Sequence, residues 1–289
     1  MQHTLYYILT NYMTTPQYIN YAEHKLDTLP ADLTVANIGA SCSYGVKFNI
    51  ININKYFELS GSDVITMRYL NVIRTMKDGK IMRHTIVNKK KVKNFFNQVS
   101  MYIKPTTSKY QYPDGVHVKI FQNGSVQTTG YKCLEDMNVV LHQLLLKFQS
   151  IRAIVEEGKI VEKQFVDNIT NLIITKFKIN MIVCTHRLDY ALNLEKLYNV
   201  LLKNKIKCRY EPCNHACVNV KFQPTNYDKR ISTFIYQKGS ATITGAKYVD
   251  HILQTYNFIV PFLGVHKLAF AKKDQQDITD IMDSLLNTI

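Results

Sequence analysis

"KIFQNGSVQTTGYK", residues 119–132, is repeated as "FIYQKGSATITGAK" at residues 234–247. Aligned without gaps, seven of the fourteen positions are identical, and both copies carry Gln, then Gly-Ser, then Thr-Gly, then Lys. An internal repeat of this kind predicts that the chain builds the same supersecondary unit twice. We therefore expect two related structural units.

Each copy predicts a β-hairpin followed by a long helix. Residues alternate between two faces in "VHVKIFQ" (116–122) and "ISTFIYQ" (231–237), and each run ends at a glycine turn. Asn-Gly between alternating runs is a strong hairpin signal. Apolar residues then recur at helical spacing after Lys132 and after Lys247. Pro261 is expected to end or kink the second helix.

Further strands are predicted before each hairpin. "FFNQVSMYIKP" (95–105) and "ACVNVKFQP" (216–224) close with proline, and "LTVANIGASC" (33–42) and "FKINMIVCTH" (177–186) open the two copies ahead of a short helix. The two units together predict an α+β fold, in which one antiparallel sheet carries its helices on a single face. The expected boundaries are an N-terminal extension at 1–30, repeat one at 31–152 with a basic insert at 64–93, a linker at 153–171, and repeat two with a C-terminal tail at 172–289.

The net charge points to an acidic partner. Lys and Arg outnumber Asp and Glu by 36 to 22, which gives +14 and a pI near 9.4. Charge of this size favours nucleic acid first and an anionic membrane surface second. A sheet with helices on one face leaves its other face open. Nucleic acid is the expected occupant of that open face.

Several other classes of protein find no support in the sequence. No apolar run reaches the length of a membrane span, and the first ten residues do not form a signal peptide. Six irregularly spaced cysteines favour reduced thiols over a disulfide framework. Cys208, Cys213, His215 and Cys217 are metal-ligand types, but their spacing matches no zinc pattern, and buried thiols with a loop histidine are the preferred interpretation. No nucleotide-binding loop, zinc-protease motif or nucleophile elbow is present, so we expect no enzyme, cofactor, metal or small-molecule substrate.

At this point the sequence resembles the TATA-box-binding protein family. "TTGYK" (128–132) and "ITGAK" (243–247) are similar to that family's repeated Thr-Gly-Ala-Lys signature, and "YEP" (210–212) is similar to a tripeptide of its second repeat. "NIGASC" (37–42) resembles the opening strand of a repeat. The resemblance is good from about 172 to 265 and patchier from about 33 to 150. It is closest in character to the divergent TATA-binding-like proteins of large nucleocytoplasmic DNA viruses.

The resemblance implies a saddle-shaped fold whose concave sheet binds the minor groove, a mode of binding for which TATA-binding protein is itself the standard example. Phe95 and Phe121 fall where the kinking phenylalanines of repeat one belong, and Phe96 can replace Phe95 if the alignment slips by one residue. Tyr236 takes the second wedge position of repeat two. The first wedge position there falls on Asn214 or His215, which are not wedges.

The resemblance also implies contacts with the groove floor. Asn37 fits a base-contacting asparagine, whereas repeat two has Met181 at that position and Asn180 one residue early. Lys119, Gln127, Ser232 and Thr242 stand where the family has small apolar residues, which puts a strict TATA preference in doubt. The full set of expected DNA-contacting residues is Asn37, Phe95, Phe96, Phe121, Asn123, Gln127, Thr129, Asn180, Val183, Tyr236, Lys238, Thr242, Thr244, Lys89, Lys90, Lys91 and Lys93.

Two of these assignments have plainer alternatives. Aromatic residues on strands are usually core, but Phe121 and Tyr236 share a repeat position on the face opposite Ile120 and Ile235. The insert at 64–93 holds nine Lys or Arg and one acidic residue around an Asp78-Gly79 hairpin turn. Its charges either form a solvated surface or contact phosphates.

The sequence thus predicts a viral TATA-binding-like initiation factor. Its expected partners are double-stranded DNA, with AT-rich promoters favoured, a TFIIB-like factor and RNA polymerase, with no membrane partner. Its expected location is the site of viral transcription, in a cytoplasmic factory, the nucleus or the virion, and not outside the cell. Two alternatives remain open: a basic DNA-binding protein of low sequence preference, and a protein-interaction scaffold that keeps the saddle without bending DNA.

Overall fold

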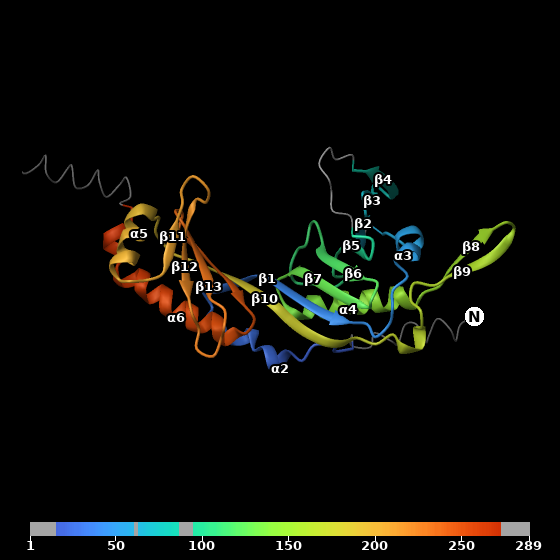
Figure 1. The fold of residues 1–289 in the computed structure, drawn as a ribbon, viewed down its shortest axis with the longest axis horizontal. Coiled ribbons are helices and arrows are strands. Elements are labelled where there is room, and N and C mark those ends of the chain that lie inside the picture. The colour runs from blue at the N-terminus through green and yellow to red at the C-terminus, as the bar shows by residue number, and fades with distance from the viewer. Residues whose placement is uncertain (1–15, 61–62, 87–94, 273–289) are drawn as a thin grey trace, which may run out of the picture. The chain divides into compact units, whose positions relative to one another are not determined.

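The computed structural model describes residues 16–60, 63–86 and 95–272, and Figure 1 shows its elements. Its described residues divide into two compact units. Unit 1 comprises residues 16–23 and 37–180, and unit 2 comprises residues 24–36 and 181–272. Strands β1 (Leu33–Ser43) and β10 (Thr175–Arg187) contribute residues to both.

In unit 1 the strand order is β1-β7-β6-β5-β2-β3-β4, with the hairpin β8-β9 separate. Its further elements are α3 (Ile50–Tyr56), β2 (Val64–Tyr69), β3 (Val72–Lys77), β4 (Lys80–Thr85), β5 (Gln98–Ile103), β6 (Val116–Phe121), β7 (Ser125–Tyr131), α4 (Leu134–Gln149), β8 (Arg152–Glu156), β9 (Lys159–Lys163) and the 3-10 turn η2 (Ile169–Asn171).

In unit 2 the strand order is β10-β14-β13-β12-β11. Its further elements are α5 (Leu194–Lys203), β11 (Cys208–Tyr210), β12 (Cys217–Phe222), β13 (Ile231–Tyr236), β14 (Ser240–Ala246), α6 (Val249–Val265) and α7 (Lys267–Phe270), and the N-terminal α2 (Tyr21–His24) and η1 (Leu26–Thr28) precede β1 in the chain.

The two units repeat one another element by element. Strands β1, β2, β5, β6 and β7 of unit 1 occupy the places that β10, β11, β12, β13 and β14 occupy in unit 2. Every pairing between them within a unit is antiparallel. The hairpin β3-β4 has no counterpart in the described part of unit 2. Within the segment 64–93, strand β2 therefore belongs to the repeated unit, and only the strands after it are additional to the repeat. The predicted α+β class and both predicted hairpins are confirmed.

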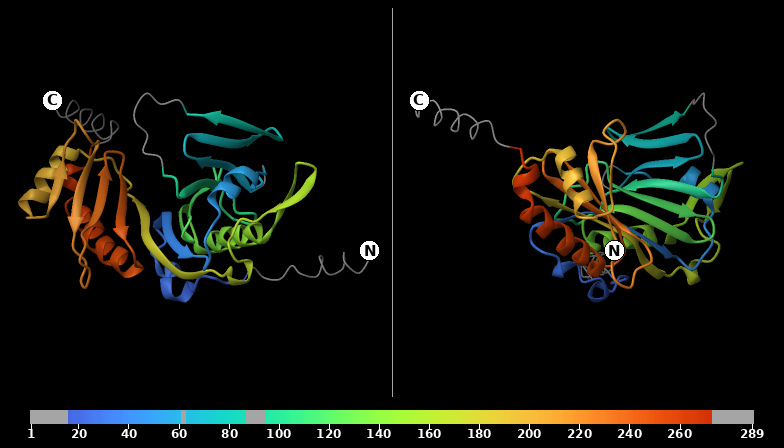
Figure 2. Two further views of the ribbon diagram at one scale, coloured as in Figure 1. Left: turned by 45° about the vertical axis from the view of Figure 1, so that its right-hand side comes forward. Right: turned by 60° about the vertical axis from the view of Figure 1, so that its left-hand side comes forward.

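Alternation along the strands places the helices on one face. Val116, Val118 and Ile120 of β6 are fully buried, while the residues between them are half-buried. In each unit the long helix packs on the sheet, α4 against β7 and α6 against β13 and β14. The two views in Figure 2 show α4 and α6 each along one face of the strands of its own unit.

Two features of the chain differ from expectation. Helix α6 does not end at Pro261 but continues to Val265, because Ile259 and Leu263, both fully buried, hold the helix on the core on either side of the proline. The segment expected as a linker, 153–171, contains most of the β8-β9 hairpin and the η2 turn.

The N-terminal extension packs on unit 1 in a way that the sequence did not predict. Ile19 is 1% exposed, and Asn138 of α4 makes two hydrogen bonds with this segment. Its side-chain oxygen accepts from the Tyr18 backbone N–H at 2.8 Å, and its amide nitrogen donates to the Pro16 carbonyl at 2.9 Å. Within the described residues no helix has both the length and the apolar character needed to span a membrane.

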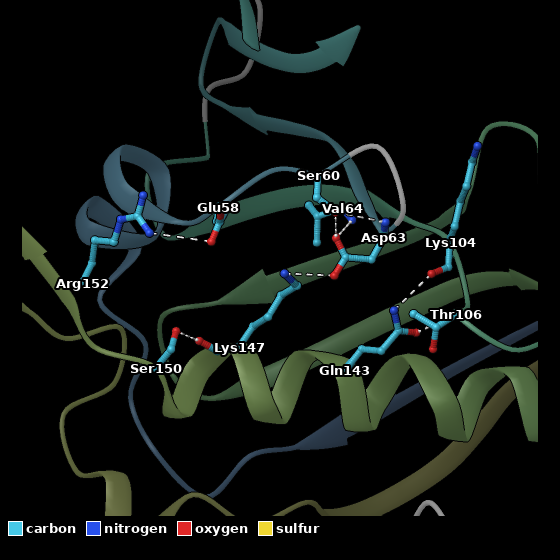
Figure 3. Close-up of polar contacts among 10 residues, drawn as sticks. All are labelled: Glu58, Ser60, Asp63, Val64, Lys104, Thr106, Gln143, Lys147, Ser150 and Arg152. Atoms are coloured by element: carbon cyan, nitrogen blue, oxygen red, sulfur yellow. Dashed lines mark hydrogen bonds and ion pairs between the residues drawn. The ribbon is translucent and has the colours of Figure 1, made fainter. Parts of the chain in front are cut away.

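Strand β2 is fastened to α4 at its first residues, as Figure 3 shows. The Lys147 ammonium lies 2.9 Å from one oxygen of Asp63, and the Ser60 hydroxyl donates to the other oxygen at 2.6 Å. The backbone N–H of Val64 donates to the same carboxylate. Burial alone would raise the pKa of Asp63, but these hydrogen bonds and the Lys147 charge outweigh it, so the pKa is lowered.

A lowered pKa makes the carboxylate a source of stability that depends on pH. It is present above the unfolded pKa of about 3.9 and is lost as the pH falls through the folded pKa. We expect Asp63→Asn to lower the free energy of unfolding by about 1 kcal/mol at pH 7. The difference from the wild type should shrink below about pH 4, as measured by urea unfolding at several pH values.

The exposed pair Glu58–Arg152, at 3.6 Å, provides the control. Because exposed ion pairs contribute little, Glu58→Gln should change stability by no measurable amount. Equal effects of the two substitutions, or a difference for Asp63→Asn that does not shrink at all as the pH falls below about 4, would contradict this assignment.

Candidate nucleic-acid interface

The helix-free face of unit 1 presents a row of polar and aromatic side chains. Phe121 pairs with Gln98 across β6 and β5, and Lys119 pairs with Ser100 on β5 and Gln127 on β7. Phe121 and Lys119 are half-buried, whereas Ile120 between them is fully buried on the helix side. Gln127 is exposed. A cation, an aromatic ring and an amide thus share the face that no helix of the described residues covers.

The repeated Thr-Gly signature builds a β-bulge in each unit. In unit 1 the register skips Gly130, whose φ is +108°, and in unit 2 it shifts at Gly245, whose φ is +98°. An extra residue in one strand leaves a backbone N–H without a ladder partner. In unit 1 the N–H of Gly130 donates to the side-chain oxygen of Asn37 at 2.8 Å, and the Thr129 hydroxyl donates to the same atom at 3.1 Å.

The matching site in unit 2 has different chemistry. The Thr244 hydroxyl lies 3.4 Å from the sulfur of Met181, a weak acceptor that replaces the amide oxygen. Asn37–Thr129 and Met181–Thr244 are therefore equivalent pairs. Two donors on the Asn37 oxygen orient its amide so that the NH₂ group is left to donate elsewhere. Met181 has no such group.

Phe95 and Phe96 line two different hollows of unit 1. Phe95, 59% exposed, borders a hollow of about 420 Å³ together with Lys119, His117 and Tyr102. Phe96, 71% exposed, borders another of about 620 Å³ beside α3. The sequence left the wedge assignment open between the two phenylalanines, and only Phe95 shares a hollow with residues of the helix-free face.

The first hollow is bordered by cations and stacked rings. Tyr102 and His117 stack with ring centroids 4.9 Å apart, and Arg68 is exposed at the border. Burial, and then the charge of Lys119, lowers the pKa of His117, so this imidazole is neutral at pH 7. The positive charge at this hollow therefore comes from Arg68 and Lys119.

On the equivalent surface unit 2 presents Tyr236 and, two residues before it on the same face of β13, the half-buried Phe234. Tyr236, 40% exposed, pairs with Cys217, and Lys238 in the next turn is exposed. Asn214 and His215, at the other wedge position, are exposed in the loop between β11 and β12, where both backbone N–H groups donate to the Glu211 carbonyl. The remaining predicted residues of unit 2 are Val183, Thr242 and Thr244, all half-buried.

Some predicted contact residues also have structural partners. The Asn123 side-chain oxygen accepts from the Ser125 N–H at 3.1 Å and so stabilises the hairpin turn. Asn180, which lies in unit 1, accepts from the Ser41 hydroxyl at 3.3 Å. Ser232 is buried and its hydroxyl accepts from the ammonium of Lys221, so a second cation stands beside the predicted groove floor.

The insert forms the predicted hairpin, with Asp78 and Gly79 at φ +50° and +73° in the turn between β3 and β4. Arg74 is a structural residue that the sequence did not reveal, because its guanidinium donates to the carbonyls of Asn54 and Phe57. The exposed cations of this hairpin are Lys77, Lys80 and Arg83. Lys89, Lys90, Lys91 and Lys93 lie outside the described residues.

The cysteines of the described chain are all free thiols. Burial raises the pKa of Cys42 and of Cys184 to about 12, so both are protonated and unreactive at neutral pH. In the part of the chain that the structure describes, no group of three or more His, Cys, Asp or Glu residues lies close enough together to hold a metal ion.

The comparisons with known proteins agree with this arrangement of repeats. Residues 176–265, which hold the bulge, hairpin and long helix of unit 2, match the family model described as transcription factor TFIID, or TATA-binding protein. Residues 176–265 are therefore similar to a TATA-binding protein domain.

One viral relative extends the likeness to most of the chain. A TATA-box-binding protein-like protein of Acanthamoeba polyphaga mimivirus is 29% identical over 252 residues, covering 83% of this chain and 67% of the relative. The TATA-binding protein of Methanococcus jannaschii is 14% identical and covers 79% of this chain and 96% of its own, with a TM-score of 0.47. The suspected resemblance to TATA-binding-like proteins of large DNA viruses is confirmed.

A TATA-binding protein domain implies a DNA-binding function in transcription. The family consists of DNA-binding factors that act with the transcription machinery, not of enzymes. Within this chain, the family match covers the repeat that carries Tyr236 and Phe234 on its helix-free face, whereas the other repeat carries Phe95, Phe121 and Asn37.

Proposed function

We propose that this protein is a transcription initiation factor that binds promoter DNA in the minor groove and nucleates recruitment of RNA polymerase. The single observation that carries the proposal is the exposure of Phe95 on the helix-free face of unit 1, beside Lys119. A large apolar ring that is 59% exposed gains free energy by entering an apolar site. A base stack next to a cationic surface is such a site.

The chemistry of Asn37 supports the minor groove as the target. A·T and T·A pairs present only acceptors there, whereas G·C pairs add a donor. Because the Asn37 oxygen is occupied by Thr129 and Gly130, the side chain meets DNA as a donor. A donor matches the acceptors of A·T pairs and leaves the G amino group unmatched. Asn37 would therefore favour AT-rich sequence in its half of the site.

Other residues weaken this preference. Lys119 and Gln127 offer further polar groups on the same face of unit 1, and Thr242 is half-buried on β14 of unit 2. Long polar side chains adapt to more than one base pair, so the ratio of specific to non-specific affinity should be moderate. This observation favours, as the second candidate, a basic DNA-binding protein of low sequence preference.

An electrophoretic shift series on AT-rich and GC-rich duplexes, at several salt concentrations, tests the proposal. A promoter factor gives a higher affinity for the AT-rich duplex that persists as salt rises, whereas non-specific binding gives strong salt dependence and equal affinities for the two duplexes. Binding to neither duplex would contradict both candidates and favour a scaffold that keeps the repeats without bending DNA.

The partners follow from the same proposal. The assembly would contain promoter DNA, a TFIIB-like factor and RNA polymerase. The likeness to the mimivirus protein supports a role in viral transcription, so the site of viral transcription is the proposed location, in a factory, the nucleus or the virion.

The basic insert is proposed to contact phosphates. Neutralising Lys89, Lys90, Lys91 and Lys93 together should reduce the slope of log affinity against log salt by up to about 0.9 for each phosphate that is no longer bound. Neutralising Lys196, Lys203 and Lys207, which lie in and just after α5 on the helix side of unit 2, is the control and should leave the slope unchanged. Equal slopes for wild type and the insert variant would mean that the insert is a solvated loop.

A further inference from the structure

The β8-β9 hairpin carries an exposed apolar face. Val155 and Ile160 are cross-strand partners and are 73% and 77% exposed, the values of side chains that touch almost nothing. On the opposite face, Lys163 forms an ion pair with Glu156 at 2.8 Å and its ammonium lies 5.9 Å from the centre of the Tyr56 ring. That face, which also carries the half-buried pair Ile154 and Val161, is directed to the unit, and Val155 and Ile160 on the other face have no partner within the described residues.

The base of this hairpin is fixed while its tip projects, as Figure 1 shows. Beyond β9, the chain pairs with the segment after β1, where Phe48 and Val166 form a bridge and the Asn49 N–H donates to the Phe165 carbonyl at 2.8 Å. An isolated two-stranded hairpin is marginally stable in water. Exposing an aliphatic pair on it brings no gain in folding, so its apolar face is better explained by binding.

The apolar face leads into the larger hollow of unit 1. Alternate residues of a strand share a face, so Ile160, Glu162 and Gln164 follow one another along one side. Glu162 and Gln164 line the hollow of about 620 Å³, together with Ile51 of α3 and Phe96, which are 60% and 71% exposed. The face of the hairpin and the hollow form one surface, which we name the hairpin groove. It consists of Val155, Ile160, Glu162, Ile51 and Phe96.

The charge of the hairpin groove differs from that of the chain. Residues 152–167 hold three basic and four acidic side chains, in a protein with 36 basic and 22 acidic residues. The charged residues at the hollow are Lys47, Glu162 and Asp167. A surface without net positive charge gains little from phosphates. A second copy of this chain, at +14, would also meet long-range repulsion on approach.

We propose that the hairpin groove binds an extended segment of another protein, with an apolar side chain seated between Ile160 and Ile51 and a flanking Lys or Arg beside Glu162 and Asp167. An apolar and aromatic centre with a polar rim is the usual arrangement of a protein-binding surface. The hollow of this site is bordered by Phe96, and the hollow of the helix-free face by Phe95.

Phage-displayed random 12-residue peptides are the probe. They are selected on the full-length protein in the presence of excess duplex DNA, which occupies the cationic face. The best peptides are then synthesised and their affinities measured by fluorescence anisotropy. Ile160→Ser and Ile51→Ser should each weaken binding at least tenfold. Leu268→Ser, at a 99% exposed apolar position in α7 of unit 2, is the matched control and should have no effect.

Duplex affinity of the same variants separates this proposal from the proposed function, because all three should bind DNA within twofold of the wild type. Three results would overturn the proposal: selected peptides that bind the Ile160→Ser variant as tightly as the wild type, a loss of DNA affinity in that variant, or a wild-type dimer in sedimentation that Ile160→Ser dissolves. A loss of DNA affinity would mean that the hairpin groove binds nucleic acid. A dimer that the substitution dissolves would mean that the groove is a contact between two copies of the chain.

Discussion

Phe121→Ala is expected to weaken binding to an AT-rich duplex by about 5- to 150-fold, corresponding to roughly 1–3 kcal/mol for one aromatic–base contact. The bend of the DNA should fall with it. The reason is that Phe121 lies on the face opposite the buried Ile120, half-exposed, where its ring is available to a base step. Gel-shift affinity and the transfer efficiency between dyes at the two DNA ends measure the two effects.

Two control variants make this result interpretable. Ile120→Ala, at a fully buried neighbouring position, should lower the melting temperature strongly, whereas Phe121→Ala should not. Phe96→Ala should leave bending intact if Phe95 is the partner wedge, because Phe96 borders the other hollow. A Phe121→Ala protein that melts well below the wild type and bends DNA normally would show that Phe121 is a core residue.

Gly124→Ala should be among the most destabilising single substitutions in unit 1. Gly124 has φ +88°, and a Cβ built there would lie 2.0 Å from the Val46 carbonyl oxygen. The left-handed conformation alone costs a non-glycine residue about 1–2 kcal/mol, and the backbone overlap must add to that. We expect a loss of more than about 3 kcal/mol in the free energy of unfolding, a value that places a substitution among the severe ones.

Gly79 supplies a matched control for Gly124. It too has a positive φ, +73°, but a Cβ there would meet no atom within 4 Å. Gly79→Ala should therefore cost only the conformational part, about 1–2 kcal/mol. Urea unfolding followed by circular dichroism compares the two. Equal losses would mean that the overlap with Val46 is relieved by a small shift of the loop.

The repeat made much of the fold predictable. The sequence predicted both hairpins, both long helices and the strands before them, because the same pattern of residues occurs in both copies of the repeat. The glycines after Gln122 and Gln237 mark the hairpin turns. Asn37 and Thr129 were predicted as separate contacts with DNA. That they contact each other at a bulge was not readable, because the register of β1 against β7 is a long-range property.

Other features depend on contacts between distant residues. Nothing near Asp63 in sequence identifies Lys147 as its partner, and nothing in α4 identifies Asn138 as the residue that holds the N-terminal segment. The choice between Phe95 and Phe96 needed the three-dimensional surroundings of each ring. Of the two outcomes expected at Pro261, an end or a kink of the helix, the end does not occur, because the tertiary packing of Ile259 and Leu263 outweighs local propensity.

The differences between the units predict an asymmetric complex with DNA. Unit 1 presents Phe95 and Phe121, together with an Asn37 amide oriented to donate. Unit 2 presents Tyr236, whose hydroxyl needs a hydrogen-bond partner, the half-buried Phe234, and Met181 in place of the asparagine. The half of the site under unit 1 should therefore be kinked more strongly, and one orientation on a near-palindromic duplex should be preferred.

The most direct test of this account measures the bend of each half-site separately. Dye pairs on the DNA span each half, and a third dye on Cys213, an exposed cysteine of unit 2, identifies which half lies under that unit. The account predicts that protein binding shortens the distance across the half under unit 1 clearly more than across the other half. Two equal kinks placed symmetrically about the centre, or no shortening in either half, would contradict it.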